Sequence, residues 1–189
     1  EGREDRRTID ERHDEERARL IPLPSTPYEN HKLVEVHVCR YSTAQVDRNR
    51  YSVPTAYVGR WLQAELGCDR VRFYADHKRV ADHARLFGHS QWQLDPLHYL
   101  GLIHQRIGAF ESARPIRQWR AHWPAVYETL LGELRQRLGD TRGTREFVEV
   151  LQLHGRYSAE EVEAAVRQAL QCHTYGYEAV KHLRLRQDS

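Results

Sequence analysis

Between residues 31 and 90, apolar residues recur at every second position. Three such series run through residues 34–38, 62–66 and 71–75. Successive side chains of a strand point to opposite faces, so this period of two predicts half-buried β-strands. Turn-forming residues follow the last two series, and short strands at close spacing are typical of a small antiparallel β-barrel.

From about residue 92, apolar positions recur in steps of three and four, as on one face of an α-helix. The longest stripe runs from Trp123 to Leu138 and stops before Gly139, a residue that favours a helix end. Ser158 and Glu161 form a capping box that predicts the start of a later helix. We expect further helices after Asp95, at about 144–154 and near 177–183. The pattern thus predicts an α-helical C-terminal domain at residues 91–189.

The first thirty residues have no apolar period. Residues 1–20 carry eight acidic and six basic side chains, and Pro22, Pro24 and Pro27 follow. Such a segment is either a solvated helix with opposite charges four residues apart or a flexible connection. We interpret residues 1–30 as a charged and Pro-rich linker, which makes the fold class α+β: a linker, a small β-barrel at 31–90 and a helical domain.

Composition indicates where in the cell the protein is expected and what its cysteines do. Charged residues make up 30% of the 189 positions, and we find neither an apolar run long enough for a membrane span nor a secretory leader. These features favour a cytoplasmic location. Three widely spaced cysteines indicate neither a disulfide framework nor a thiolate metal site. The absence of methionine indicates a piece of a longer protein.

One hexapeptide carries a family resemblance. Residues 49–54 read Asn-Arg-Tyr-Ser-Val-Pro, with Pro27-Tyr28-Glu29 before them and Asp95-Pro96-Leu97-His98-Tyr99-Leu100 after them. In order and spacing, these segments resemble IstA-type DDE transposases of bacterial insertion sequences. The resemblance implies the region after the catalytic domain, with a β-barrel like that of Mu transposase. It also implies double-stranded DNA at the transposon ends, other transposase subunits and an AAA+ helper ATPase as partners, and Mg²⁺ in a catalytic domain that precedes this region.

The residues themselves indicate no catalytic centre. A two-metal nuclease site needs carboxylates at the ends of buried strands. The acids of the predicted barrel lie instead at turns or on outward faces, and no alternating βα pattern is present. None of the twelve histidines stands in a recognised zinc spacing. We therefore assign no catalytic residue, no metal ligand and no cofactor to this chain.

The cations of the predicted barrel are the candidates for a function. Residues 31–90 carry ten basic and six acidic side chains, and nearly all cations are arginines, whose planar fork suits phosphate. DNA-backbone contacts need surface cations rather than a fixed sequence. The candidate DNA-binding residues are Arg48, Arg50, Arg60, Arg70, Arg72, Lys78, Arg79 and Arg85. The alternative interpretation is that these side chains only keep a small barrel soluble.

Two functions remain open from the sequence. The first is a non-catalytic transposase region that binds DNA backbone and supports assembly of the synaptic complex. The second is a protein-interaction module that recruits the helper ATPase and binds little DNA, since amphipathic helices with Trp92, Trp119 and Trp123 can present a face to a partner. An independent nuclease has no carboxylate cluster to support it.

Overall fold

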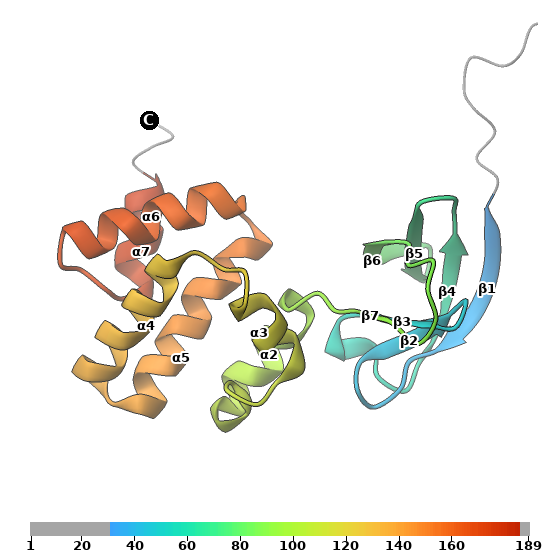
Figure 1. Ribbon diagram of the computed structural model, residues 1–189, viewed down its shortest axis with the longest axis horizontal. Helices are drawn as coiled ribbons and strands as arrows, with labels where there is room; N and C mark the ends of the chain where they lie inside the picture. The colour runs from blue at the N-terminus through green and yellow to red at the C-terminus, as the bar shows by residue number, and fades with distance from the viewer. Residues whose placement is uncertain (1–30, 186–189) are drawn as a thin grey trace, which may run out of the picture. The chain divides into compact units, whose positions relative to one another are not determined.

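The computed structural model describes residues 31–185, with side chains to residue 183. Strands occupy the first part of this range and helices the second (Figure 1). The α+β class expected from the change of period is therefore confirmed. The linker expected at residues 1–30 lies outside the described residues.

Four antiparallel strands form the larger sheet. They are β1 (Lys32–His37), β4 (Trp61–Leu66), β5 (Arg70–Ala75) and β6 (Lys78–Ala84), in the order β1-β4-β5-β6. The inward positions are those that the period of two predicts, with Val36, Leu62, Val71 and Phe73 buried. Asp76 and His77 join β5 to β6 with φ angles of 48° and 63°, as in the tight hairpin turns that match strand twist.

A second sheet contains β2 (Thr43–Val46), β3 (Asn49–Ser52) and β7 (Trp92–Gln93). β2 pairs antiparallel with β3, whereas β7 pairs with β3 in parallel. The small strand-rich unit expected here is present, but the described strands form two separate ladders that do not close into a barrel. The apolar period determines which side chains face inward, but it does not reveal that a strand beyond residue 90 would pair with β3.

Both sheets share one hydrophobic cluster. Tyr51 and Phe73 are fully buried in it, with ring centroids 6.2 Å apart. The remaining buried members are Val36, Val38, Ala44, Val46, Val53, Leu62, Ala64, Val71 and Ala81. Side chains from both ladders therefore form one core although the backbone hydrogen bonds do not close a barrel.

Six α-helices follow within the described residues. They are α2 (Leu97–Gln105), α3 (Arg114–Arg120), α4 (Ala125–Leu138), α5 (Asp140–Gln152), α6 (Ala159–Gln171) and α7 (Tyr177–Leu185). In the same described range, three single turns of 3₁₀-helix connect elements: η1 (Thr55–Tyr57), η2 (Ile107–Ala109) and η3 (Leu153–Gly155). The capping box before α6 is confirmed, because Glu161 N donates to Ser158 Oγ and Ser158 N donates to Glu161 Oε2. The sequence pattern did not predict the short helix α3, and α5 begins at Asp140 rather than near residue 144.

The helices bury a second hydrophobic cluster, in which Tyr127, Leu134, Phe147 and Val166 are almost inaccessible. α4 packs on α5, and α6 on α7 (Figure 1). Gly143 allows a close approach of α4 and α5, because a Cβ atom there would lie 2.5 Å from the backbone carbonyl of Leu134. Within residues 31–185, no helix combines the length and the apolar character needed to cross a bilayer.

Candidate nucleic-acid interface

The hexapeptide at residues 49–54 forms β3 and the residues after it. A two-residue turn at Asp47 and Arg48, with φ angles of 46° and 66°, leads into the strand. The strand has β2 on one side and β7 on the other. Each of its side chains can therefore contact a segment distant in sequence.

Asn49 holds the loop that precedes β7. Its side chain is fully buried and donates to the carbonyl oxygens of Leu86 and Gly88 at 3.0 and 2.8 Å. Its Oδ1 accepts from the backbone N–H of Gln91 at 3.0 Å. One amide thus satisfies three backbone groups of the loop, and its position inside the protein excludes a contact with DNA.

Tyr51 and Val53 are fully buried and pack in the core. The Tyr51 hydroxyl also accepts a hydrogen bond from Leu86 N at 2.9 Å, and burial is the main reason that its pKa is raised. His83 is buried beside Tyr51 and donates from Nε2 to the Ser52 carbonyl oxygen at 2.6 Å. His83 therefore has a structural hydrogen-bonding role inside the strand-rich part.

Ser52 connects β3 to the start of α2. Its Oγ accepts from Asp95 N at 2.8 Å and lies 2.9 Å from His98 Nδ1. His98 Nε2 lies 3.7 Å from a carboxylate oxygen of Asp95. These three residue types also occur in hydrolase triads, but Ser52 is fully buried and its hydroxyl is occupied by the two contacts. Burial, opposed by Asp95 and reinforced by His83, lowers the His98 pKa to about 4, so the ring is neutral at pH 7.

Four of the eight candidate cations form ion pairs with neighbouring acids. Arg70 and Arg79 contact Asp82 at 2.6 and 3.4 Å, and Arg72 contacts Glu65 at 2.8 Å. These residues lie on the solvent-facing side of the larger sheet. This face is therefore a mixed-charge surface rather than a purely basic one.

Arg85 is the fourth paired cation. Its guanidinium donates to the Gly67 carbonyl oxygen at 2.8 Å and to Asp47 Oδ2 at 3.0 Å. It therefore ties the turn before β5 to the turn before β3. A phosphate would have to compete with Asp47 for this side chain.

The other four candidates, Arg48, Arg50, Arg60 and Lys78, have no acidic ion-pair partner among the described residues. Arg48, Arg60 and Lys78 are exposed, and Arg50 is half-buried. They do not form a single patch. Arg60 lines a cavity of about 380 Å³ together with the turn at 76–77, next to Lys78. Arg48 lies towards the other end of the larger sheet. It follows Asp47 in sequence, and Asp47 pairs with Arg85 at the end of β5 and β6 that is roughly 17 Å along the strands from Lys78.

Arg50 belongs to a group that the sequence pattern did not reveal. Its guanidinium carbon lies 5.2 Å from the ring centroid of Trp92, its neighbour across β3 and β7. The guanidinium carbon of Arg114, at the start of α3, lies 4.7 Å from the same centroid. The sequence pattern places Trp92 with the amphipathic helices, because nothing in it signals a strand of two residues. One feature of the sequence could have indicated this group: Arg114 and Arg117 are three residues apart and so share one face of a helix.

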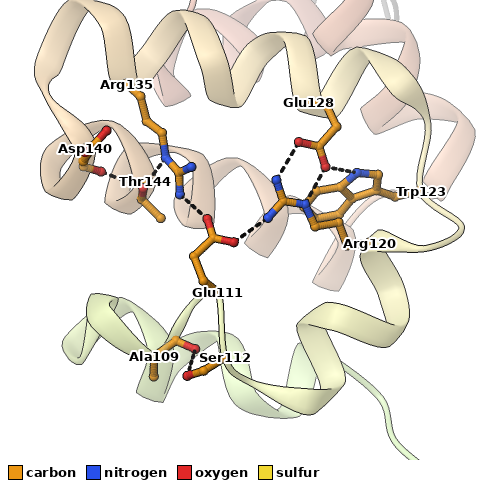
Figure 2. A network of polar contacts seen from close by, with 9 residues as sticks. All are labelled: Ala109, Glu111, Ser112, Arg120, Trp123, Glu128, Arg135, Asp140 and Thr144. Carbon is orange, nitrogen blue, oxygen red and sulfur yellow. Dashed lines mark hydrogen bonds and ion pairs between the residues drawn. The ribbon is translucent and has the colours of Figure 1, made fainter.

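A polar network fixes α3 against the neighbouring helices (Figure 2). Arg120 donates to both carboxylate oxygens of Glu128, at 2.6 and 2.7 Å, and to Glu111 at 2.6 Å. Glu111 also accepts from Arg135, and Trp123 Nε1 donates to Glu128. Hydrogen bonds from arginine lower the pKa of the Glu111 and Glu128 carboxyls. The network therefore restrains the helix that carries Arg114 and Arg117.

Within the described residues, no three His, Cys, Asp or Glu side chains come together in a way that could hold a metal ion. Cys68 and Cys172 are exposed free thiols, and Cys39 is half-buried. The site therefore consists of cations, aromatic rings and hydrogen-bonding groups.

Comparisons with known proteins agree with the resemblance found in the sequence. Residues 23–95 match the family described as Mu transposase, C-terminal domain. The transposase for insertion sequences IS1326/IS1353 of Pseudomonas aeruginosa is 31% identical over 172 residues, which cover 87% of this chain and 32% of that protein. The transposase for insertion sequence element IS21 of the same organism is 34% identical over 132 residues, or 69% of this chain and 31% of that protein.

A transposase of Aminobacter aminovorans is 30% identical over 161 residues. The chain spans about a third of the length of the curated relatives it matches. No solved structure matches the chain significantly. The matched family covers the strands described above, and the relatives extend over most of the chain. Residues 23–95 therefore carry a Mu transposase C-terminal domain, and the chain belongs among the C-terminal regions of insertion-sequence transposases.

Proposed function

We propose that this region binds the DNA backbone during transposition and supports assembly of transposase subunits on the transposon ends, without catalysing a reaction itself. The observation that carries the proposal is the division of the eight candidate cations. Arg48, Arg50, Arg60 and Lys78 have no acidic partner among the described residues, whereas the other four form ion pairs. Unpaired surface cations bind phosphate and release counterions without reading base sequence.

The distribution of these cations supports contacts along an extended ligand. Arg60 and Lys78 lie at one end of the larger sheet, and Arg48 lies towards the other. A small anion could not reach both ends, but a duplex carries charge along its whole length. We therefore expect weak, distributed and strongly salt-dependent binding to any duplex sequence.

The test is the affinity of the chain for a fluorescently labelled 30-base-pair duplex, measured by anisotropy between 50 and 300 mM salt. We expect the triple variant Arg48→Ala, Arg60→Ala, Lys78→Ala to bind at least about tenfold more weakly and to reduce the salt slope by about 2.7, because each lost phosphate contact contributes about 0.9. The matched control removes three exposed arginines from the helical part, Arg142, Arg145 and Arg156. Equal losses in both variants would show only an effect of net charge and would contradict the proposal.

A second function is supported by a different observation. Tyr41, Val58 and Leu102 are 58%, 41% and 40% exposed, and they line a cavity of about 600 Å³ with Tyr99. Exposed apolar side chains around one concavity suit a protein partner, and the helper ATPase is the partner expected for this class. A Leu102→Asp variant with unchanged DNA affinity but weaker helper binding would support this function. If the wild-type chain binds the helper and shows no salt-dependent DNA binding, this second function replaces the first.

A further inference from the structure

A groove of about 880 Å³ lies between β7 and α3. Trp92, Pro96 and Pro115 contribute apolar surface, whereas Arg114, Arg117 and His122 contribute polar groups. None of its lining residues, all within the described part of the chain, is Asp or Glu. The groove thus combines an apolar floor with arginine side chains that no carboxylate of its own lining neutralises.

Arg114, which lines the groove, and Arg50, which lies beside it, both contact the ring of Trp92, a lining residue. The guanidinium carbons of Arg50 and Arg114 lie 5.2 and 4.7 Å from the Trp92 centroid, so they are at most about 10 Å from each other. Like charges at this distance repel one another within a Debye length. Neither has an acidic ion-pair partner in the described residues. An anion bound between them would therefore relieve this repulsion and gain two charge-assisted contacts.

Helix α3, which carries Arg114 and Arg117, is fixed in place by its contacts with the other helices. Ile116 is buried in the helical cluster, and Arg120 is fixed by Glu111 and Glu128 (Figure 2). Arg114 and Arg117 are exposed on this helix. Because the backbone is restrained, binding a ligand here orders the two side chains but does not have to order the helix.

The chemistry of the groove favours a sugar–phosphate strand as its ligand. A planar guanidinium group can donate two parallel hydrogen bonds to two oxygens of one phosphate. Each DNA strand carries one charge per about 3.4 Å of axis, so a segment spanning 10 Å offers about three phosphates. The apolar faces of Trp92 and the two prolines suit the deoxyribose rings between them. A carboxylate-bearing peptide would match the charges, but Arg50 already belongs to the cations that we propose for DNA.

We propose that the groove between β7 and α3 is a DNA-backbone site in which Arg50, Arg114 and Arg117 bind phosphates of one strand. This site rests on the proposed function and extends the DNA interface from the strands to the helical part. It assigns a role to Arg114 and Arg117, which lie outside the set of cations expected from the sequence.

The experiment measures duplex affinity of the 189-residue chain carrying Arg114→Ala and Arg117→Ala, with Arg142→Ala and Arg145→Ala as the charge-matched control. We expect the groove variant to bind at least about tenfold more weakly at 100 mM salt, with a salt slope smaller by about 1.8. The control should stay within about twofold of wild type. A variant with Arg114→Lys and Arg117→Lys keeps the charge but loses the planar forks, so its affinity should lie between the two.

A second measurement follows the indole N–H resonances of Trp92 and Trp119 by NMR, assigned with Trp→Phe variants, while the duplex is added. We expect both signals to shift in wild type and to stay fixed in the groove variant. Far-ultraviolet circular dichroism verifies that each variant is folded.

The outcomes separate the two proposals. If the groove variant binds like wild type while the Arg48, Arg60 and Lys78 variant is weakened, the groove site is wrong and the proposed function stands. If wild type binds no duplex, the proposed function fails and the groove site fails with it. If duplex binding is unchanged but a polyglutamate peptide binds wild type and not the groove variant, the groove is a site for an acidic protein segment instead.

Discussion

Asn49 shows how one side chain can organise a segment forty residues away. Its amide bonds to Leu86, Gly88 and Gln91, and these residues lead directly into β7. Buried polar groups cost free energy when their partners are removed, because water cannot replace the lost bonds. The position of Trp92 beside Arg50 therefore depends on an amide that does not touch the groove.

We expect Asn49→Ala to lower the free energy of unfolding by about 3 kcal/mol, since it leaves three backbone groups without their partner. Urea denaturation measures the loss, and hydrogen exchange at residues 86–91 should accelerate more than exchange in α4. Gln45→Ala provides the control, because Gln45 is exposed on the adjacent strand. Its effect should stay within about 0.5 kcal/mol. Equal effects of both changes would contradict this role of Asn49.

At the scale of elements, the α4–α5 hairpin depends on the absence of one side chain. Gly143 lies against the backbone of α4, where a Cβ would come within 2.5 Å of Leu134 and 2.6 Å of Arg135. Gly132, on α4, has nothing within 4 Å of the same hypothetical atom. Both glycines are in helices, so their intrinsic helix propensities are alike and only the packing differs.

The two glycines should therefore respond to alanine with opposite signs. Gly143→Ala must push the helices apart and should cost about 2 kcal/mol or more, as overpacking does. Gly132→Ala should stabilise the chain by about 0.5–1 kcal/mol through helix propensity. Thermal and urea unfolding of the two variants measure the difference. If Gly143→Ala is neutral, the close approach of α4 and α5 is incorrect.

At the scale of the whole described chain, two hydrophobic clusters are joined by a polar junction. Ser52 and His83 belong to the strands, and Asp95 and His98 lie at the start of the helices. Burial lowers the pKa of His83 and His98 at this junction and of His154 between the helices. All three rings are therefore more easily protonated in the unfolded chain.

This difference predicts how stability depends on pH. When folding lowers the pKa of a histidine, its contribution to stability is complete at a pH above the pKa of the unfolded state. The contribution is lost as the pH falls towards the pKa of the folded state. For His98 the window runs from about pH 6.5 to about pH 4. A pKa difference of one unit corresponds to about 1.4 kcal/mol. We therefore expect this ring to lower the free energy of unfolding by about 2–3 kcal/mol across the window. Urea unfolding at pH 7, 5.5 and 4.5 measures it, and His98→Gln should flatten the dependence. An equally steep dependence in His98→Gln would assign the effect to other groups.

The sequence predicted more of the fold than of the site, for a physical reason. Apolar periodicity identifies the inward side chains of β4 and β5, because burial acts through local alternation. It could not reveal that Trp92 pairs with β3, since a strand of two residues has no period. Pairing of Arg70 with Asp82 was also hidden, because the two residues meet across adjacent strands and not within one. The predicted DNA-binding role of the eight cations stays a prediction.

The net charge of the solvent-facing side of the larger sheet depends strongly on one residue, Asp82. This single carboxylate lies within 4 Å of the guanidinium groups of Arg70, Arg72 and Arg79. Exchange of Asp82 for a neutral residue would remove a carboxylate that all three arginines contact, while the contact of Arg72 with Glu65 would stay. The attraction of this surface for polyanions can therefore change by mutation at one position, without any new cation and without a change in the core.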